Sequence, residues 1–500
     1  HRNLMGSRTG LENQGVYDLN VAPQELMKNS GGAGHWGLYS YVARLNYEYQ
    51  GKYLIELIGR ADGSSRFAEG FKWANYGGAS LGWVLTEEAF LRNNPIVSFW
   101  KLKASYGEMG NQVGIGENDY VSTIGTGSIP FGSTPALQNT ARVSGLTTNV
   151  RTWERVKMTN FGTEFTLLRH KLTGSFDYYI KRNEDMLASV VYPALLGGNA
   201  PKTNNADLET KGWEAVLGYK DKVGNLRYGV SMNMGNSTNE LIRLEGADSY
   251  TAGKVGQREG YPLNSYFMYQ TNGLFADQAA VDAYYATYTA TQQGEVPVQG
   301  NAAQELRPGD IIKVDADGNG YISAISDEGG DVRYMGDAAP HFNYGINANL
   351  GWKGFDFTAS FQGVLNQNIQ RTGHMSYPFR AIWSTSTTSY MGKTWSETNT
   401  SADYPRLTTN GTRSGYNWLN NDFALQNNRY LRLKTLVIGY TLPDFVLEKI
   451  RLKKARLYLS GNDLWEATSI KDGYDPEMGE TGSNIYPFTR TYSLGLDISF

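Results

Sequence analysis

Apolar and polar residues alternate one by one over many stretches of the chain. In the last ten residues, TYSLGLDISF, one side of an extended strand would carry Tyr492, Leu494, Leu496, Ile498 and Phe500, and the other side only small or polar residues. A period of two is the sequence signal of a β-strand with two different faces. The same alternation predicts about thirteen strands, at residues 40–49, 53–61, 73–84, 100–108, 160–168, 172–181, 212–220, 226–236, 341–352, 355–364, 429–441, 455–462 and 489–500.

The lengths of the strands and loops distinguish two kinds of all-β fold. Strands of soluble sandwiches average about 5–6 residues, whereas a tilted strand needs roughly 9–11 residues to cross a bilayer. Short turns alternate here with long polar loops, at 109–159, 183–211, 237–340 and 365–428. That habit is typical of outer-membrane barrels, so we expect an all-β chain that forms a transmembrane antiparallel β-barrel wall with long extracellular loops. The apolar stretch at 265–275 breaks the alternation, either as a strand above the membrane or as one whose neighbour the pattern does not reveal.

The amino-acid composition argues against several kinds of partner and site. The net charge is −3 and Lys and Arg form no cluster with interleaved aromatic residues, which argues against a nucleic-acid partner. The absence of cysteine excludes disulfides and thiolate metal sites. The sequence contains no run of 18 apolar residues, so it predicts no transmembrane helix. Strands of a membrane barrel alternate apolar and polar residues, so the low mean hydropathy of −0.46 is compatible with such a barrel. The five histidines are scattered and no catalytic constellation is evident, so we expect no enzyme activity.

Longer motifs occur in a fixed order along nearly the whole chain. They include YVARLNYEYQGKYLIELIGRADGSSRF at 41–67, WKLKASYGEMGNQ at 100–112, TWERVKMTNFGTEF at 152–165, YLRLKTLVIGYTLP at 430–443, GYDPE at 473–477 and YPFTRTYSLGLDISF at 486–500. Taken together they resemble the SusC/RagA family of TonB-dependent outer-membrane transporters of Bacteroidetes. The resemblance implies a 22-stranded barrel with a plugged lumen. Residues 1–500 would be its C-terminal portion, an open wall of about thirteen strands, with the N-terminal plug and first strands absent from this chain.

The resemblance also implies a function and partners. We expect active import of oligosaccharides or peptides across the outer membrane of a Gram-negative, Bacteroidetes-like bacterium. A SusD-like surface lipoprotein would be the partner, outer-membrane lipid the surroundings, and TonB–ExbB–ExbD would supply energy through the missing N-terminal part. Two alternatives are a SusC-like barrel that serves as a structural scaffold in an envelope complex, and a passive porin.

The closing strand carries a candidate assembly signal. Outer-membrane barrels commonly end on a polar residue, a glycine two positions later, and apolar residues up to a final Phe. Ser493, Gly495, Ile498 and Phe500 match that pattern, so the resemblance implies recognition by the barrel-assembly machinery. An open strand edge in lipid leaves backbone groups without partners, which is why closure matters.

One local motif suggests a metal. DADGNGYISAISDE, in the expected long loop region 276–340, has oxygen-bearing side chains at alternate positions and a glycine at position six, as in a Ca²⁺ loop. The candidate ligands are Asp315, Asp317, Asn319, the carbonyl of Tyr321, and Asp327. Position twelve is Ser326, which departs from the usual acidic ligand. A polar Asp/Gly/Asn turn that needs no metal explains the motif equally well.

The loop at 365–428 is rich in large aromatic residues, which are Tyr377, Phe379, Trp383, Trp395 and Trp418. Aromatic side chains of this kind pack loops together or contact a partner protein. They also stack on sugar rings. We expect packing or partner contact here, with a sugar site as the alternative.

Overall fold

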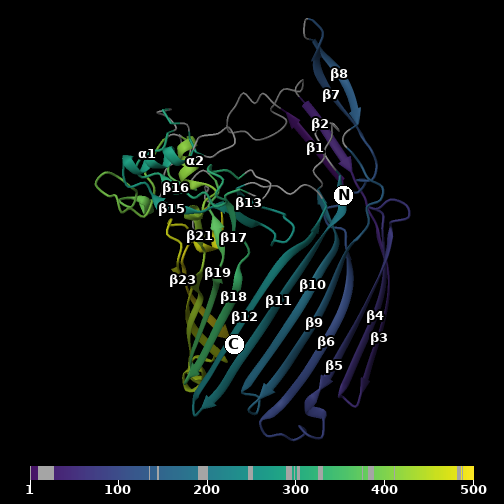
Figure 1. The fold of residues 1–500 in the computed structure, drawn as a ribbon. Helices are drawn as coiled ribbons and strands as arrows, with labels where there is room; N and C mark the ends of the chain where they lie inside the picture. The colour runs from purple at the N-terminus through teal and green to yellow at the C-terminus, as the bar shows by residue number, and fades with distance from the viewer. Residues whose placement is uncertain are drawn as a thin grey trace.

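A wall of thirteen antiparallel strands is the main element of the fold (Figure 1). The computed structural model describes residues 2–8, 27–133, 136–143, 146–189, 201–245, 252–288, 296–297, 299–300, 305–324, 330–373, 376–380, 388–409, 411–480, 486 and 488–500. The spatial order of the strands is β24-β23-β22-β19-β18-β12-β11-β10-β9-β6-β5-β4-β3. Their bounds are β3 Leu38–Tyr49, β4 Tyr53–Ser64, β5 Trp73–Val84, β6 Val97–Asn111, β9 Glu154–Leu167, β10 Leu172–Ser189, β11 Lys202–Val223, β12 Leu226–Leu244, β18 His341–Trp352, β19 Phe355–Asn366, β22 Tyr430–Thr441, β23 Lys454–Thr468 and β24 Thr491–Ser499.

All thirteen strands expected from the alternation are confirmed as strands of this sheet. Three of them extend well into the predicted loops, since β10 continues to Ser189, β11 begins at Lys202 and β12 continues to Leu244. The apolar alternation stops before these ends because charged residues replace it. Arg182, on the face of β10 that carries Tyr178, is paired with Glu209 of β11 at 2.6 Å. Strand pairing therefore continues beyond the residues for which the apolar alternation predicted it.

The wall is open along two edges. Among the described residues, β3 pairs only with β4 and β24 pairs only with β23. The two edge strands do not pair with each other, which agrees with the expectation that residues 1–500 do not seal a small barrel. Short turns such as Lys353–Gly354 join the strands at one end of the wall, here called the turn end. The longer connections lie at the opposite end, the loop end (Figure 1).

The two faces of the wall differ in polarity. One face presents large apolar side chains, with Leu45 61% exposed, Leu81 57% exposed and Leu494 70% exposed. The other face is polar, and its side chains bond across strands. Thr358 Oγ1 donates to Asn349 Oδ1 at 3.0 Å, for example. This arrangement is the reverse of a soluble sheet, in which the apolar face is covered.

The loop end carries smaller elements. Two hairpins project there, β1 (Arg2–Arg8) with β2 (Met27–Ala33) and β7 (Ile124–Phe131) with β8 (Ala136–Val143). At the turn end, helix α3 (Asp444–Ile450) joins β22 to β23. Short 3-10 helices cover Leu85–Glu87, Thr388–Tyr390, Asp422–Ala424 and Pro476–Met478. Among the described residues, no helix is both long and apolar enough to cross a bilayer.

Two long loops combine into a single folded unit at the loop end. We call it the loop module, and it consists of the described residues of 252–337 and 368–427. Its elements are β13 (Gly253–Val255), β14 (Ser265–Tyr269), β15 (Thr271–Leu274), β16 (Ile311–Lys313), β17 (Val332–Asp337), β20 (Asn368–Gln370), β21 (Leu425–Asn427), α1 (Gln278–Thr287) and α2 (Gly411–Trp418). The stretch 265–275 is thus β14 and β15, two strands outside the wall.

The loop module has a conventional apolar core. Its buried members are Val255, Phe267, Tyr269, Phe275, Val281, Tyr284, Val296, Leu306, Ile311, Ile322, Val332 and Tyr416. Tyr416 comes from the second loop and the others from the first. Arg406 and Asn417, also of the second loop, bond to the buried carboxylate of Asp310 at 2.8 and 2.9 Å. Apolar packing and buried polar contacts therefore join the two loops.

Candidate functional site

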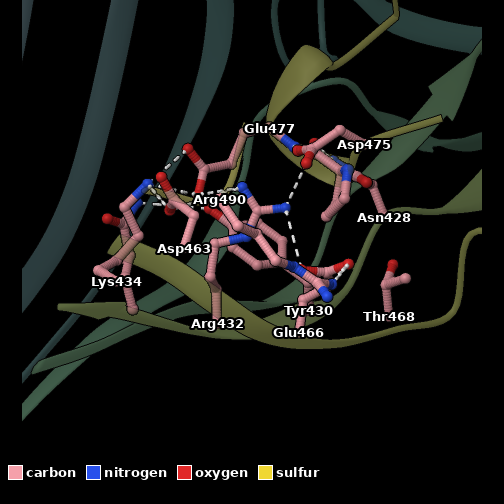
Figure 2. A network of polar contacts seen from close by, with 12 residues as sticks. Asn428, Tyr430, Arg432, Lys434, Asp463, Glu466, Thr468, Asp475, Glu477 and Arg490 are labelled. Carbon is pink, nitrogen blue, oxygen red and sulfur yellow. Dashed lines mark hydrogen bonds and ion pairs between the residues drawn. The ribbon is translucent and has the colours of Figure 1, made fainter. Parts of the chain in front are cut away.

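A cluster of charged side chains lies where β22 and β23 meet the segment that connects β23 to β24 (Figure 2). Its cations are Arg432, Lys434 and Arg490, and its carboxylates are Asp463, Glu466, Asp475 and Glu477. Strand β22 supplies two of the cations, β23 supplies two of the carboxylates, and GYDPE supplies the other two. The tertiary fold thus brings residues 430–434 together with residues 475–477.

Arg432 is the centre of this cluster. The residue is only 1% exposed, and its guanidinium donates to Asp475 and lies 3.1 Å from Glu477 Oε1. Lys434 Nζ lies 3.1 Å from the same Glu477 oxygen and 2.7 Å from Asp463 Oδ1. A buried cation needs such partners, because leaving one charge of a buried pair unpaired costs about 3–5 kcal/mol.

The backbone is shaped to bring these groups together. The pairing of β22 and β23 shifts register between Leu433 and Thr435, and Asp463 opposite this shift has a left-handed φ of 53°. Asp tolerates that conformation better than most residues. In GYDPE, the side chain of Asp475 accepts the backbone N–H of Glu477 at 2.9 Å and so begins the short helix Pro476–Met478.

Each charged group of the cluster takes part in an ion pair, so the arrangement anchors the connecting segment to the wall. In the sequence, GYDPE is one of the motifs that carry the family resemblance, and it indicates no role by itself. The usable signal was the pair of cations two positions apart in a strand that is otherwise mostly apolar, YLRLKTLVIGY. Their partners could not be identified from sequence, because they lie about forty residues further along the chain.

The structure brings together part of the predicted metal site. Carboxylate oxygens of Asp315, Asp317 and Asp331 lie within 4.8 Å of one another. Asp315 accepts the backbone N–H groups of Gly318 and Gly320 at 2.7 and 3.0 Å, which forms the tight turn expected from the motif. Three carboxylates in one place suit a hard divalent cation with oxygen ligands. The sequence interpretation missed Asp331, because it comes sixteen residues after Asp315.

Asp331 is fully buried, and burial raises the pKa of its carboxyl, against the opposing effect of backbone N–H donors. It accepts the N–H groups of Ala316 and Ser323, each at 2.7 Å. The side-chain oxygen of Asn319 accepts the N–H of Tyr321 at 3.0 Å. Asp327 lies outside the described residues. Asn319, Asp327 and the carbonyl of Tyr321 stay predicted ligands.

The candidate assembly residues lie in and just after β24. Gly495 is opposite Tyr458 of β23, and a Cβ at Gly495 would lie 2.1 Å from the Tyr458 ring, so only glycine lets the ring cross the strand. Ser493 is opposite Ser460. Ile498 and Phe500 follow on the apolar face, 44% and 82% exposed. The glycine thus has a packing reason, and the role of all four residues in assembly stays a prediction.

The aromatic residues of the second loop are largely used for packing. Trp418 is 7% exposed, and its ring stacks with Tyr377 at 6.4 Å and with Tyr404 at 5.6 Å between centroids. Trp395 lies against Gly309. Phe379 is 40% exposed, and Trp383 lies outside the described residues. Because Trp418 already stacks on two rings, the packing interpretation has the stronger support.

Comparisons with known proteins agree with this fold. No protein-family model matches the chain. TonB-dependent receptor P3 of Formosa agariphila is 28% identical over 99% of this chain and 49% of its own length. TonB-dependent receptor SusC of Bacteroides thetaiotaomicron is 28% identical over 93% of this chain and 44% of its own length. Among solved structures, the RagAB peptide importer in its closed-closed state superposes with a TM-score of 0.75 at 22% identity, over 100% of this chain and 53% of its own.

The chain is SusC/RagA-like. The solved structures establish the barrel fold, and the curated relatives extend the likeness to the sequence of the TonB-dependent receptors. This SusC/RagA-like chain spans about half the length of the curated relatives that it matches.

Proposed function

We propose that the chain forms a large part of the barrel wall of an outer-membrane importer that works with a surface lipoprotein and is energised through TonB. The observation that carries the proposal is a thirteen-stranded wall with an apolar face, in a chain that aligns over 99% of its length with a TonB-dependent receptor. The apolar face meets lipid, and the loop end faces the cell exterior. The plug and the remaining strands are supplied by residues outside 1–500 or by another polypeptide, because open strand edges are costly in hydrocarbon.

The cargo that we propose is an oligosaccharide or a peptide, which the protein moves without making or breaking a covalent bond. A peptide is supported by the fold likeness to RagAB, which is described as a peptide importer. An oligosaccharide is supported by the SusC/RagA resemblance of the motifs. Separate measurement of the uptake of each class would identify the cargo.

The experiment uses cells that express the complete receptor. Uptake of fluorescent oligosaccharides and peptides is compared among wild type, a deletion of the receptor gene and a deletion of TonB. Uptake of one class should be lost in both deletions. Uptake that persists without TonB would indicate a passive porin. A receptor deletion that leaves the uptake of both classes intact but removes other envelope proteins from their complex would indicate a scaffold.

We propose further that Asp315, Asp317 and Asp331 hold one Ca²⁺. The ion would supply positive charge between three carboxylates that otherwise repel one another. Asp331 directly precedes β17, whereas Asp315 and Asp317 follow β16. A shared ion would therefore connect two small sheets of the loop module and stabilise the module without contacting the wall.

A further inference from the structure

The segment 472–480, which we call the strap, contacts the loop module as well as the wall. Asp472 is 1% exposed and accepts Arg371 Nε at 2.8 Å. Glu480, at the other end of the strap, lies 2.5 Å from Lys254 Nζ of β13 and accepts the hydroxyl of Tyr266 of β14. Its backbone carbonyl accepts the N–H of Thr372 at 2.7 Å.

The middle of the strap contacts the wall. Asp475 and Glu477 pair with Arg432 and Lys434 of β22, and the carbonyl of Pro476 accepts Asn428 Nδ2 at 2.8 Å. The four carboxylates of the strap thus bind cations of two separate bodies. A displacement of β13 and β14 away from the strap would break the contacts at Glu480.

The module is joined to the wall differently on its other side, at β12. There the N–H of Leu241 donates to the carbonyl of Tyr261 at 3.0 Å, and the N–H of Gly260 donates back to Leu241 at 2.8 Å. Asn239 accepts the N–H of Leu263 at 2.8 Å. These contacts at β12 are hydrogen bonds, whereas the strap combines hydrogen bonds with ion pairs.

We infer that the strap is a positioning joint, which sets the place of the loop module relative to β22 and β23 through its ion pairs. Lys254 and Glu480 are partly exposed, at 36% and 25% of their side chains, so salt screens this end of the joint. Arg432, at the wall end, is buried, so its ion pairs with Asp475 and Glu477 are screened less by salt. The joint therefore releases first at Glu480, which frees β13 and β14 from the strap. The inference concerns the position of the module and stands whether or not the receptor imports the proposed cargo.

Hydrogen exchange of the complete receptor in detergent tests the joint. In Glu480→Lys, the peptides that contain β13 and β14 should exchange about fivefold faster, the effect of losing a partly exposed ion pair. The double variant Lys254→Glu/Glu480→Lys should restore slow exchange. Glu245→Lys is the matched control, because Glu245 is also paired at the loop end, with Arg243 at 2.8 Å, but lies outside the strap.

A second variant distinguishes a joint from local packing. Among the described residues, no ion pair or hydrogen bond links the side chain of Asp475 to the loop module. Asp475→Asn should nevertheless speed exchange in β13 and β14, because it loosens the wall end. Unchanged exchange there would overturn the proposal, as would faster exchange spread equally over β3 to β6. Failure of the charge swap to restore slow exchange would show that shape rather than charge holds the strap.

Discussion

The wall and the loop module place their apolar side chains in opposite ways: the wall exposes them and the module buries them. On the wall, Leu494 is 70% exposed and Tyr492 is 75% exposed, while polar side chains bond to one another on the opposite face. In the module, Val281 and Ile311 are fully buried. In the proposed membrane setting the apolar face of the wall meets lipid and can stay exposed, whereas the module must enclose a core to fold in water.

Two regions of one chain thus suit two different solvents. The wall is held by continuous strand pairing, because hydrocarbon leaves no backbone group free to bond elsewhere. The module has only short strands and depends on side-chain packing and buried ion pairs such as Arg406 with Asp310 at 2.8 Å. Substitutions should therefore have different effects in the two regions.

The largest expected effect is in the core of the module. Ile311→Asp places a carboxylate at a position with 0% exposure, and should cost more than about 4 kcal/mol. The module should become sensitive to protease, while the wall keeps its heat-modifiable mobility on gels. Val143→Asp, at a 62% exposed position of β8, is the control and should change neither property. A protease-resistant module in Ile311→Asp would contradict a water-facing core.

Substitution of Arg432 tests whether stability depends as strongly on a buried charge of the wall as on the core of the module. Arg432→Ala leaves Asp475 without its cation and Glu477 with Lys434 alone, and should destabilise the strap by about 3 kcal/mol. Faster hydrogen exchange over residues 472–480 is the expected measurement. Arg490→Ala is the control, because the Arg490 side chain is 52% exposed and should contribute less than about 1 kcal/mol. Equal effects of the two variants would show that burial of Arg432 does not matter.

The calcium proposal predicts an effect confined to the module. At calcium about a hundred times above its dissociation constant, binding stabilises the folded state by about 2.7 kcal/mol. The double variant Asp315→Ala/Asp317→Ala, or a chelator, should remove that contribution and speed proteolysis of the module without altering the wall. Asp282→Ala, an exposed position in α1, is the matched control. Identical cleavage with and without calcium would rule the ion out.

The smallest effect is expected at the end of the closing strand. Phe500→Asp puts a charge on the apolar face near the membrane interface, which should cost about 1 kcal/mol. The amount of heat-modifiable barrel in the outer membrane should fall. Ser499→Asp, on the polar face, should assemble normally. If Phe500→Asp also assembles in full, the terminal aromatic is not part of an assembly signal.

Sequence patterns predicted the wall far better than the module. Alternation placed all thirteen wall strands, because each strand has an apolar face and a polar face. The pattern stopped short at the outer ends of β10 and β11, where Arg182 and Glu209 pair in place of apolar residues. The motif around Asp315 predicted a tight turn, but neither Asp331 nor the joint core of the two loops could be read from it.

The sequence by itself determined the strands, their apolar face and the closing segment that ends at Phe500, because a period of two depends only on neighbouring residues. Only the tertiary structure decided which distant groups meet. Arg432 with Asp475, Glu480 with Lys254, and Asp315 with Asp331 are each brought together by the path of a loop. The physical reason is that ion pairs and buried carboxylates depend on distances in space, which no local periodicity encodes.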